Sequence, residues 1–183
     1  VEETLRSLGF ARVFRPLRGV VFWLGMGSPI FESPGRFGIK ARFNHPNYRI
    51  LFPPEIAGSM HFMIQGYRGG MARQRLLWKP VRKKLREWRK TYDGNTSRGP
   101  MLGFRDGRTF LMIHQRPLGS PALSHRLLGK SREIYLFCRK TRSIHELLAH
   151  FPRISEEKIL PFLRMLVDKK LMFQEGDRFL SLA

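Results

Sequence analysis

The first nine residues most constrain what this chain can fold into, because they predict a short amphipathic helix that needs a partner. Glu2 and Glu3 stand in its first turn, where the partial positive charge of a helix N-terminus stabilises carboxylates. Leu5 and Leu8 are three residues apart and form an apolar pair, and Gly9 can end the helix. Such a short helix is only marginally stable alone in water, so we expect a sheet that lies upstream in the sequence to bury its apolar side chains. On this interpretation the chain is the tail of a longer α/β protein.

A strand pattern and a loop of glycine, serine and proline follow this helix. Phe10–Phe14 predicts a short strand, and Gly25-Met-Gly-Ser-Pro-Ile30 predicts the loop. With Pro34-Gly-Arg-Phe-Gly-Ile39, this order resembles the late part of the barrel of radical S-adenosylmethionine enzymes. The chain is also similar to cobalamin-dependent members that mature ribosomally made peptides, on the additional segments Asn44-His-Pro-Asn-Tyr48, Phe52-Pro-Pro-Glu-Ile56 and Glu175–Ala183.

The resemblance implies cofactors that this chain cannot hold by the usual ligands. Such enzymes bind a 4Fe-4S cluster through three cysteines in a CxxxCxxC loop, and this chain has one cysteine, Cys138. The cluster, S-adenosylmethionine and cobalamin would then be bound mostly by a missing N-terminal part of the protein. The resemblance places Gly25, Gly27 and Ser28 near a cofactor or substrate, because a backbone without side chains can approach a ligand at the end of a barrel strand. The alternative for these three residues is a tight turn.

The composition predicts a folded protein of a reducing compartment. The sequence is 42% hydrophobic and contains 15 phenylalanines, which is enough for a core. A single cysteine, the lack of a signal peptide and the lack of a long apolar run favour the cytoplasm over secretion or a membrane. We therefore expect a cytoplasmic protein with no membrane partner. The six histidines show no metal-ligand spacing, and Cys138 lies in an apolar run that predicts a buried, inert thiol.

The net charge of +20 makes nucleic acid a candidate partner. Residues 71–99 contain ten lysines or arginines and two acidic residues, and residues 72–92 predict a basic helix with one narrow apolar stripe. Pro80 either kinks this helix or marks its true start, after a separate turn. Arg82, Lys83, Arg86 and Arg89 are the candidate polyanion-binding residues. The alternative is a solvated helix face.

Turn residues at 93–100 predict a linker and a domain boundary. Before it, the sequence predicts a helix that starts at Pro54 and continues through Ile64. We divide the chain into residues 1–70 (the end of a barrel and a following segment), 71–99 (the basic helix and linker) and 100–183 (a C-terminal module).

The C-terminal module shows strand signals, then helix signals, then a last hairpin. Asp106-Gly107 predicts a turn between two apolar runs, and Ser143 with Glu146 predicts a helix-capping box. The predicted strands are 101–104, 110–113 and 123–128, the predicted helices are 132–139, 144–151 and 156–170, and the last hairpin joins 171–173 to 179–182. This order is typical of a winged-helix fold. It resembles the peptide-recognition domain found beside peptide-maturing radical enzymes, which binds a leader peptide as an added strand.

These patterns predict an α+β protein: a partial α/β barrel end, a basic helical connector and a winged-helix-like module. The leading hypothesis is that the chain is the C-terminal fragment of a radical S-adenosylmethionine enzyme that modifies a ribosomally made peptide. C-methylation is one reaction that the resemblance implies. Its module would recognise the precursor peptide or close the structure. The fragment alone is expected to be inactive, and no residue is singled out as the catalyst. The alternative is a basic winged-helix protein that binds nucleic acid without enzymatic activity. The predicted helix 156–170 is a poor base reader, because its acidic residues would repel phosphates.

Overall fold

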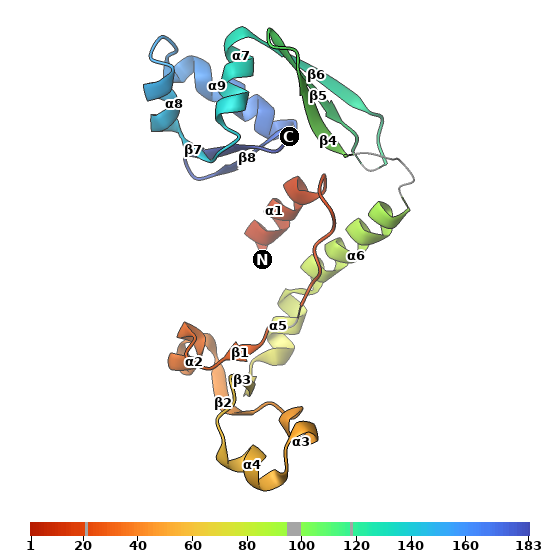
Figure 1. The fold of residues 1–183 in the computed structure, drawn as a ribbon, viewed down its shortest axis with the longest axis vertical. Coiled ribbons are helices and arrows are strands. Elements are labelled where there is room, and N and C mark those ends of the chain that lie inside the picture. The colour runs from red at the N-terminus through yellow and green to blue at the C-terminus, as the bar shows by residue number, and fades with distance from the viewer. Residues whose placement is uncertain (21, 95–99, 118) are drawn as a thin grey trace. The chain divides into compact units, whose positions relative to one another are not determined.

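The computed structural model describes residues 1–183 except 21, 95–99 and 118. The described residues form a mixed α+β structure in which the strands make three small antiparallel sheets (Figure 1). The chain divides into two compact units. Unit one is Leu17–Leu85 together with Val1, and unit two is Glu2–Pro16 together with Arg86–Ala183. No helix among the described residues has the length and apolar character needed to cross a membrane.

Unit one is built on a three-stranded sheet with the order β1-β3-β2. Short helices connect its strands, and two basic helices follow it. The elements are β1 (Leu24–Gly25), α2 (Pro29–Glu32), η1 (Pro34–Phe37), β2 (Ile39–Asn44), α3 (Tyr48–Leu51), α4 (Pro54–Ser59), β3 (Ile64–Gly69), α5 (Met71–Leu77) and α6 (Lys79–Asp93), the last of which continues into unit two.

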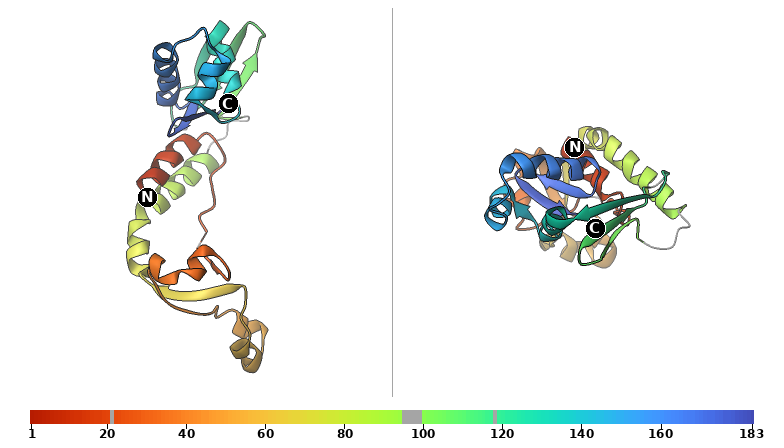
Figure 2. Two further views of the ribbon diagram at one scale, coloured as in Figure 1. Left: turned by 90° about the vertical axis from the view of Figure 1, so that its left-hand side faces the viewer. Right: turned by 90° about the horizontal axis from the view of Figure 1, so that it is seen from above.

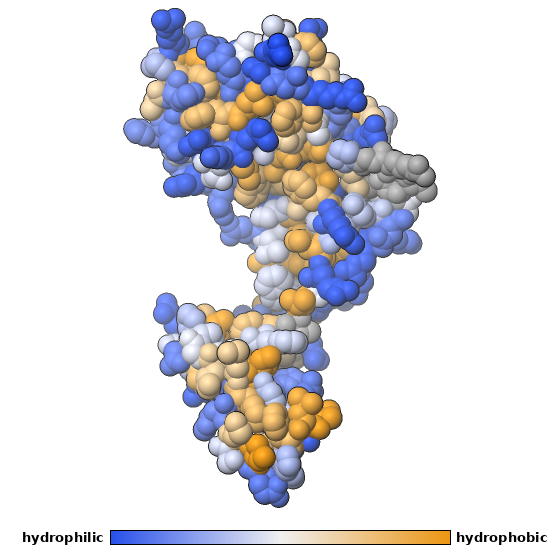
Figure 3. Space-filling view, viewed as in Figure 1, coloured by the Kyte–Doolittle hydropathy of each residue, from blue (hydrophilic) through white to orange (hydrophobic). Residues whose placement is uncertain are grey.

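The core of unit one is small. Leu24, Ile39 and Ala57 are among its few buried apolar side chains. An aromatic stack adds to them, with the rings of Tyr48 and Phe62 4.0 Å apart. Most other large apolar side chains of this unit are exposed, and Figure 3 shows orange side chains gathered over the α3–α4 region.

Two predictions for the N-terminal half are wrong. Phe10–Phe14 is not a strand, because the first helix, α1 (Glu2–Ala11), continues through Phe10 and Ala11 and a turn follows. The helix that starts at Pro54 ends at Ser59, and Ile64 begins β3. The pairing of β2 with β3 was not predicted from sequence. Pro80 marks the start of a helix and does not kink one, because α5 is a separate helix and Pro80 is the second residue of α6. In the first turn of a helix the backbone nitrogen has no intrahelical hydrogen-bond partner, so a proline is tolerated there.

Unit two contains the elements predicted for the C-terminal module. A meander of β4 (Leu102–Asp106), β5 (Phe110–Gln115) and β6 (Leu123–Leu128) has β5 at its centre. The capping box of Ser143 and Glu146 is present at the start of α8. The remaining elements are α7 (Gly129–Phe137), β7 (Arg142–Ser143), α8 (Ile144–His150), α9 (Glu156–Asp168), β8 (Met172–Glu175) and β9 (Arg178–Ser181), with the second sheet ordered β7-β9-β8. The predicted linker at 93–100 lies mostly outside the described residues.

The core of unit two joins both of its sheets to the helices. Leu111 and Ile113 of the meander, Leu163 of α9 and Leu171 before β8 are fully buried in one cluster. Tyr135 at its centre donates its hydroxyl proton to the backbone oxygen of Leu171 at 3.0 Å, and burial raises the pKa of this phenol to about 12. The buried hydroxyl is thus a structural hydrogen-bond donor.

The first helix packs on the C-terminal part of unit two. Leu8 and Phe10 are 6% and 5% exposed. The ring of Phe10 meets the ring of Phe173 of β8 edge to face at 5.3 Å, and Arg6 donates to the backbone oxygen of Gln174 at 2.5 Å. The prediction that the apolar side chains of this helix need an upstream sheet is therefore wrong for Leu8, which is buried within unit two, while Leu5 is half-buried. Figure 2 shows α1 beside the C-terminal part of α6 in both views.

Candidate functional site

Strand β6 presents an open edge of the meander. In the order β4-β5-β6 it pairs with β5 along its whole length, from Leu123 opposite Gln115 to Leu128 opposite Phe110. Its other edge has no strand partner among the described residues. Alternate backbone N–H and C=O groups of an edge strand point away from the sheet, so β6 can accept a further strand.

The side chains of β6 make this edge partly apolar. Leu127 points with Leu111 into the core, and Leu123 lies on the same face but is 48% exposed. On the other face Leu128 is 54% exposed. An added strand could therefore bury apolar side chains at both ends of β6.

A buried amide connects β6 to the C-terminal end of α9. Gln115 is 5% exposed and donates from Nε2 to the backbone oxygen of Lys169 at 2.9 Å. Its Oε1 lies 3.1 Å from Nε2 of His125 on β6. The amide nitrogen of Gln115 donates to the backbone oxygen of Lys169, so the atom that faces His125 is the amide oxygen, which can only accept a hydrogen bond. The neutral imidazole of His125 is therefore assigned the tautomer with its proton on Nε2. The helix end is thus held beside the open strand.

The same geometry disfavours the charged form of His125. Burial lowers the pKa of His125, and the positive charge of Lys169 lowers it further. A protonated imidazole could still donate to Gln115, but it would be partly desolvated beside a lysine. These surroundings therefore favour the neutral imidazole, whose Nε2–H is donated to Gln115.

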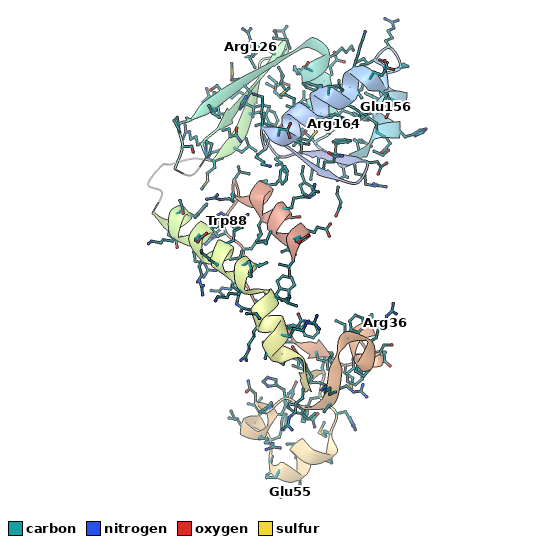
Figure 4. All side chains as sticks on the ribbon, turned by 180° about the vertical axis from the view of Figure 1, so that it is seen from behind. Arg36, Glu55, Trp88, Arg126, Glu156 and Arg164 are labelled. Atoms are coloured by element: carbon teal, nitrogen blue, oxygen red, sulfur yellow. The ribbon has the colours of Figure 1, made fainter. Side chains whose placement is uncertain are left out.

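The surroundings of β6 are cationic. Arg126 is exposed on β6 with its guanidinium over the ring of Phe110 at 5.0 Å, and Lys169 is exposed at the end of α9. Figure 4 labels Arg126 on β6 and Arg164 on α9. A bound segment that carries carboxylates would be attracted to this side of unit two.

The structure brings Gly25, Gly27 and Ser28 together in one turn of unit one. Gly25 pairs in β1 with Ile64, and Gly27 has φ +77°, which favours glycine. The hydroxyl of Ser28 accepts from the backbone N–H of Phe31 at 3.2 Å and caps α2. These observations explain the three residues as parts of a tight turn. A cofactor-binding role for them stays a prediction.

The four candidate polyanion-binding residues, Arg82, Lys83, Arg86 and Arg89, are all exposed on α6. Arg82 also donates from its guanidinium to the backbone oxygen of Arg75 and so ties α6 to α5. The four side chains share the side of the helix opposite the buried Trp88, which Figure 4 labels on α6.

Cys138 does not fit an iron-sulfur cluster. It is fully buried at the end of α7, and burial raises the pKa of its thiol to about 12, so the thiolate that iron requires is disfavoured. Among the described residues, no group of three histidines, cysteines or carboxylates is placed to hold a metal ion.

Sequence reasoning found β6 with its correct bounds but missed the link from His125 through Gln115 to Lys169. Nothing in the spacing of these residues signals that contact, since 54 residues separate Gln115 from Lys169. With this geometry established, comparisons with protein-family models, with curated proteins and with solved structures found no match to the chain.

Proposed function

We propose that unit two captures an extended peptide as an added strand along β6. The observation that carries the proposal is the open edge of β6 beside exposed apolar side chains and the end of α9. Strand addition of this kind gives affinity through main-chain hydrogen bonds and specificity through alternate side chains. The order of three strands, three helices and a terminal hairpin supports a winged-helix-like module of the peptide-recognition type.

Side-chain burial must supply the net affinity. A peptide paired along six residues of β6 makes roughly six backbone hydrogen bonds, each worth about 1 kcal/mol net. Ordering six peptide residues costs about 1–2 kcal/mol for each, or about 6–12 kcal/mol in total, so this cost equals or exceeds the gain from the hydrogen bonds. Leu123 and Leu128, each about half exposed, are therefore the side chains on which binding should depend.

We further propose that the captured peptide is the substrate of a radical S-adenosylmethionine enzyme to which this chain contributes its C-terminal part. The radical chemistry of that family, such as C-methylation, would be supplied by a cluster, S-adenosylmethionine and cobalamin bound by residues outside this sequence. The residues of unit two would bind and orient the peptide. Residues 1–70 would contribute the barrel end, and the support for this part is the resemblance of their motifs.

The test is selection of binders from a displayed library of random 12-residue peptides on the full chain, followed by hydrogen exchange with a selected peptide. We expect the amides of β6 to gain protection, and L123D and L128D to weaken binding at least tenfold. L76D is the matched control, because Leu76 is 70% exposed on α5. Protection away from β6, or equal losses in L76D and L123D, would contradict the proposal.

The alternative function, nucleic-acid binding without enzymatic activity, has little support from α9. Ile159, Leu163 and Leu166 of this helix are buried, and Glu156 and Glu157 are exposed at its N-terminal end. Figure 4 labels Glu156 at this end. Carboxylates there would repel the phosphates that flank a DNA groove.

A further inference from the structure

We propose that the exposed basic stripe of α6 binds the phosphate backbone of a single-stranded nucleic acid, a function that does not depend on peptide capture by β6. The basic stripe is defined by six exposed side chains on one side of the helix. They are Lys79, Arg82, Lys83, Arg86, Arg89 and Lys90.

Helical geometry brings these six side chains onto one face. At 3.6 residues per turn they fall within an arc of about 120°, and each turn advances about 5.4 Å along the axis. Val81 and Trp88, on the opposite side, are 5% and 2% exposed. One side of α6 is thus used for packing, and the other carries a row of cations along about three turns. Hydrophilic side chains cover the exposed side of α6 in Figure 3.

The stripe is unfavourable for the helix that carries it. Like charges four residues apart destabilise a helix, and Arg82–Arg86 and Arg86–Lys90 are two such pairs, while Glu87 stands four residues after Lys83. A solvated helix face needs no such uniform sign, since alternating charges would keep it soluble and would stabilise it. A polyanion that neutralises the row removes this repulsion on binding, which favours a polymer of phosphates over a single small anion.

The neighbouring side chains favour a single strand over a membrane or an acidic protein. A membrane-binding helix inserts its apolar side, but the apolar side of α6 is already buried within the chain. Three of the six cations are arginines, whose guanidinium groups match phosphate oxygens in pairs. Trp78 directly precedes Lys79 and is 39% exposed, so its ring is available for stacking with an unpaired base.

The test measures binding of the full chain to fluorescein-labelled 15-nucleotide oligo(dT) and oligo(U) at 50–300 mM salt. Each phosphate contact with a single strand contributes about 0.7 to the slope of log K against log salt, so six contacts predict a slope near −4. R86Q/R89Q/K90Q should reduce its magnitude by about 2. W78A should weaken binding about tenfold without changing the slope, because stacking releases no counterions.

The matched control is R153Q/K158Q/R178Q, which removes the same charge from three exposed positions of unit two outside α6. It should leave the slope within about 0.5 of that of the unmodified chain. Circular dichroism verifies that both triple variants are folded. Equal effects of the two triple variants, no binding of either oligonucleotide, or equal binding of polyglutamate or phosphatidylserine vesicles at matched charge would overturn the proposal.

Discussion

Phe10 provides the sharpest test of how the N-terminal helix is held. Its side chain is 5% exposed, meets Phe173 edge to face, and lies 4.1 Å from the ammonium group of Lys170. Burial of a phenylalanine contributes about 1.5–3 kcal/mol, and the aromatic pair adds about 0.5–1.5 kcal/mol. We therefore expect F10A to weaken the docking of α1 on unit two by about 3 kcal/mol.

A loss of that size can be measured through the hydrogen exchange rates of the α1 amides. Since 1.4 kcal/mol corresponds to a factor of ten, the undocked population should rise roughly a hundredfold. Hydrogen exchange by mass spectrometry should show α1 approaching the rate of an unstructured peptide, while β5 keeps its protection because its core does not include Phe10. F10L, which keeps the bulk and loses the ring contacts, should give an intermediate effect.

Phe14 offers a matched control four residues along the chain. It is 48% exposed, so F14A removes the same atoms from a position that buries much less. Exchange of α1 in F14A should change less than threefold. Similar exchange rates in F10A and F14A, or a loss of protection in F10A that extends equally through β5, would refute the docking argument.

Two further predictions concern unit two. Y135F removes the hydroxyl that donates to the backbone oxygen of Leu171 and accepts from the backbone N–H of Ala183 at 3.3 Å. Urea titration should show a loss of about 1 kcal/mol, because the partly buried N–H of Ala183 loses its partner while the oxygen of Leu171 keeps the N–H of Leu182 as a second donor. The pKa of His125 is lowered in the folded state, so its contribution to stability is present above its unfolded pKa near 6.5 and is lost as pH falls below that value. H125Q should flatten the dependence of the unfolding free energy on pH between about 7 and 5, and an unchanged dependence in H125Q would contradict the assignment.

The C-terminal module was predictable because its signals are local. Ser143 and Glu146 satisfy each other's helix-terminal groups within one turn, and Asp106-Gly107 closes a hairpin whose strands follow at once. Strand β6 was predicted with its observed bounds. Each of these elements pairs or packs with its sequence neighbours, so a short window contains most of the information that specifies it.

The N-terminal half was less predictable because its contacts are distant in sequence. Arg42 of β2 pairs with Tyr67 of β3, across a segment that contains two helices. Phe10 belongs to a helix although its neighbours suggest a strand, and its aromatic partner Phe173 lies near the other end of the chain. No local pattern carries that information, and tertiary packing overrides strand propensity here. The same reason explains why the hydrogen bonds of Gln115 escaped the sequence analysis.

The docking of α1 separates the two parts of the proposed function. A barrel end was inferred partly from an N-terminal helix in need of cover, and unit two supplies that cover for Leu8 and Phe10. The barrel interpretation now depends on unit one, where Val20, Ile50 and Met63 are 82%, 83% and 74% exposed. Peptide capture by β6 does not share that dependence, because its strand edge, its exposed leucines and its link to α9 all lie within unit two. A chain without any barrel could still hold a peptide in this way, so binding at β6 and membership of a radical enzyme are independent claims.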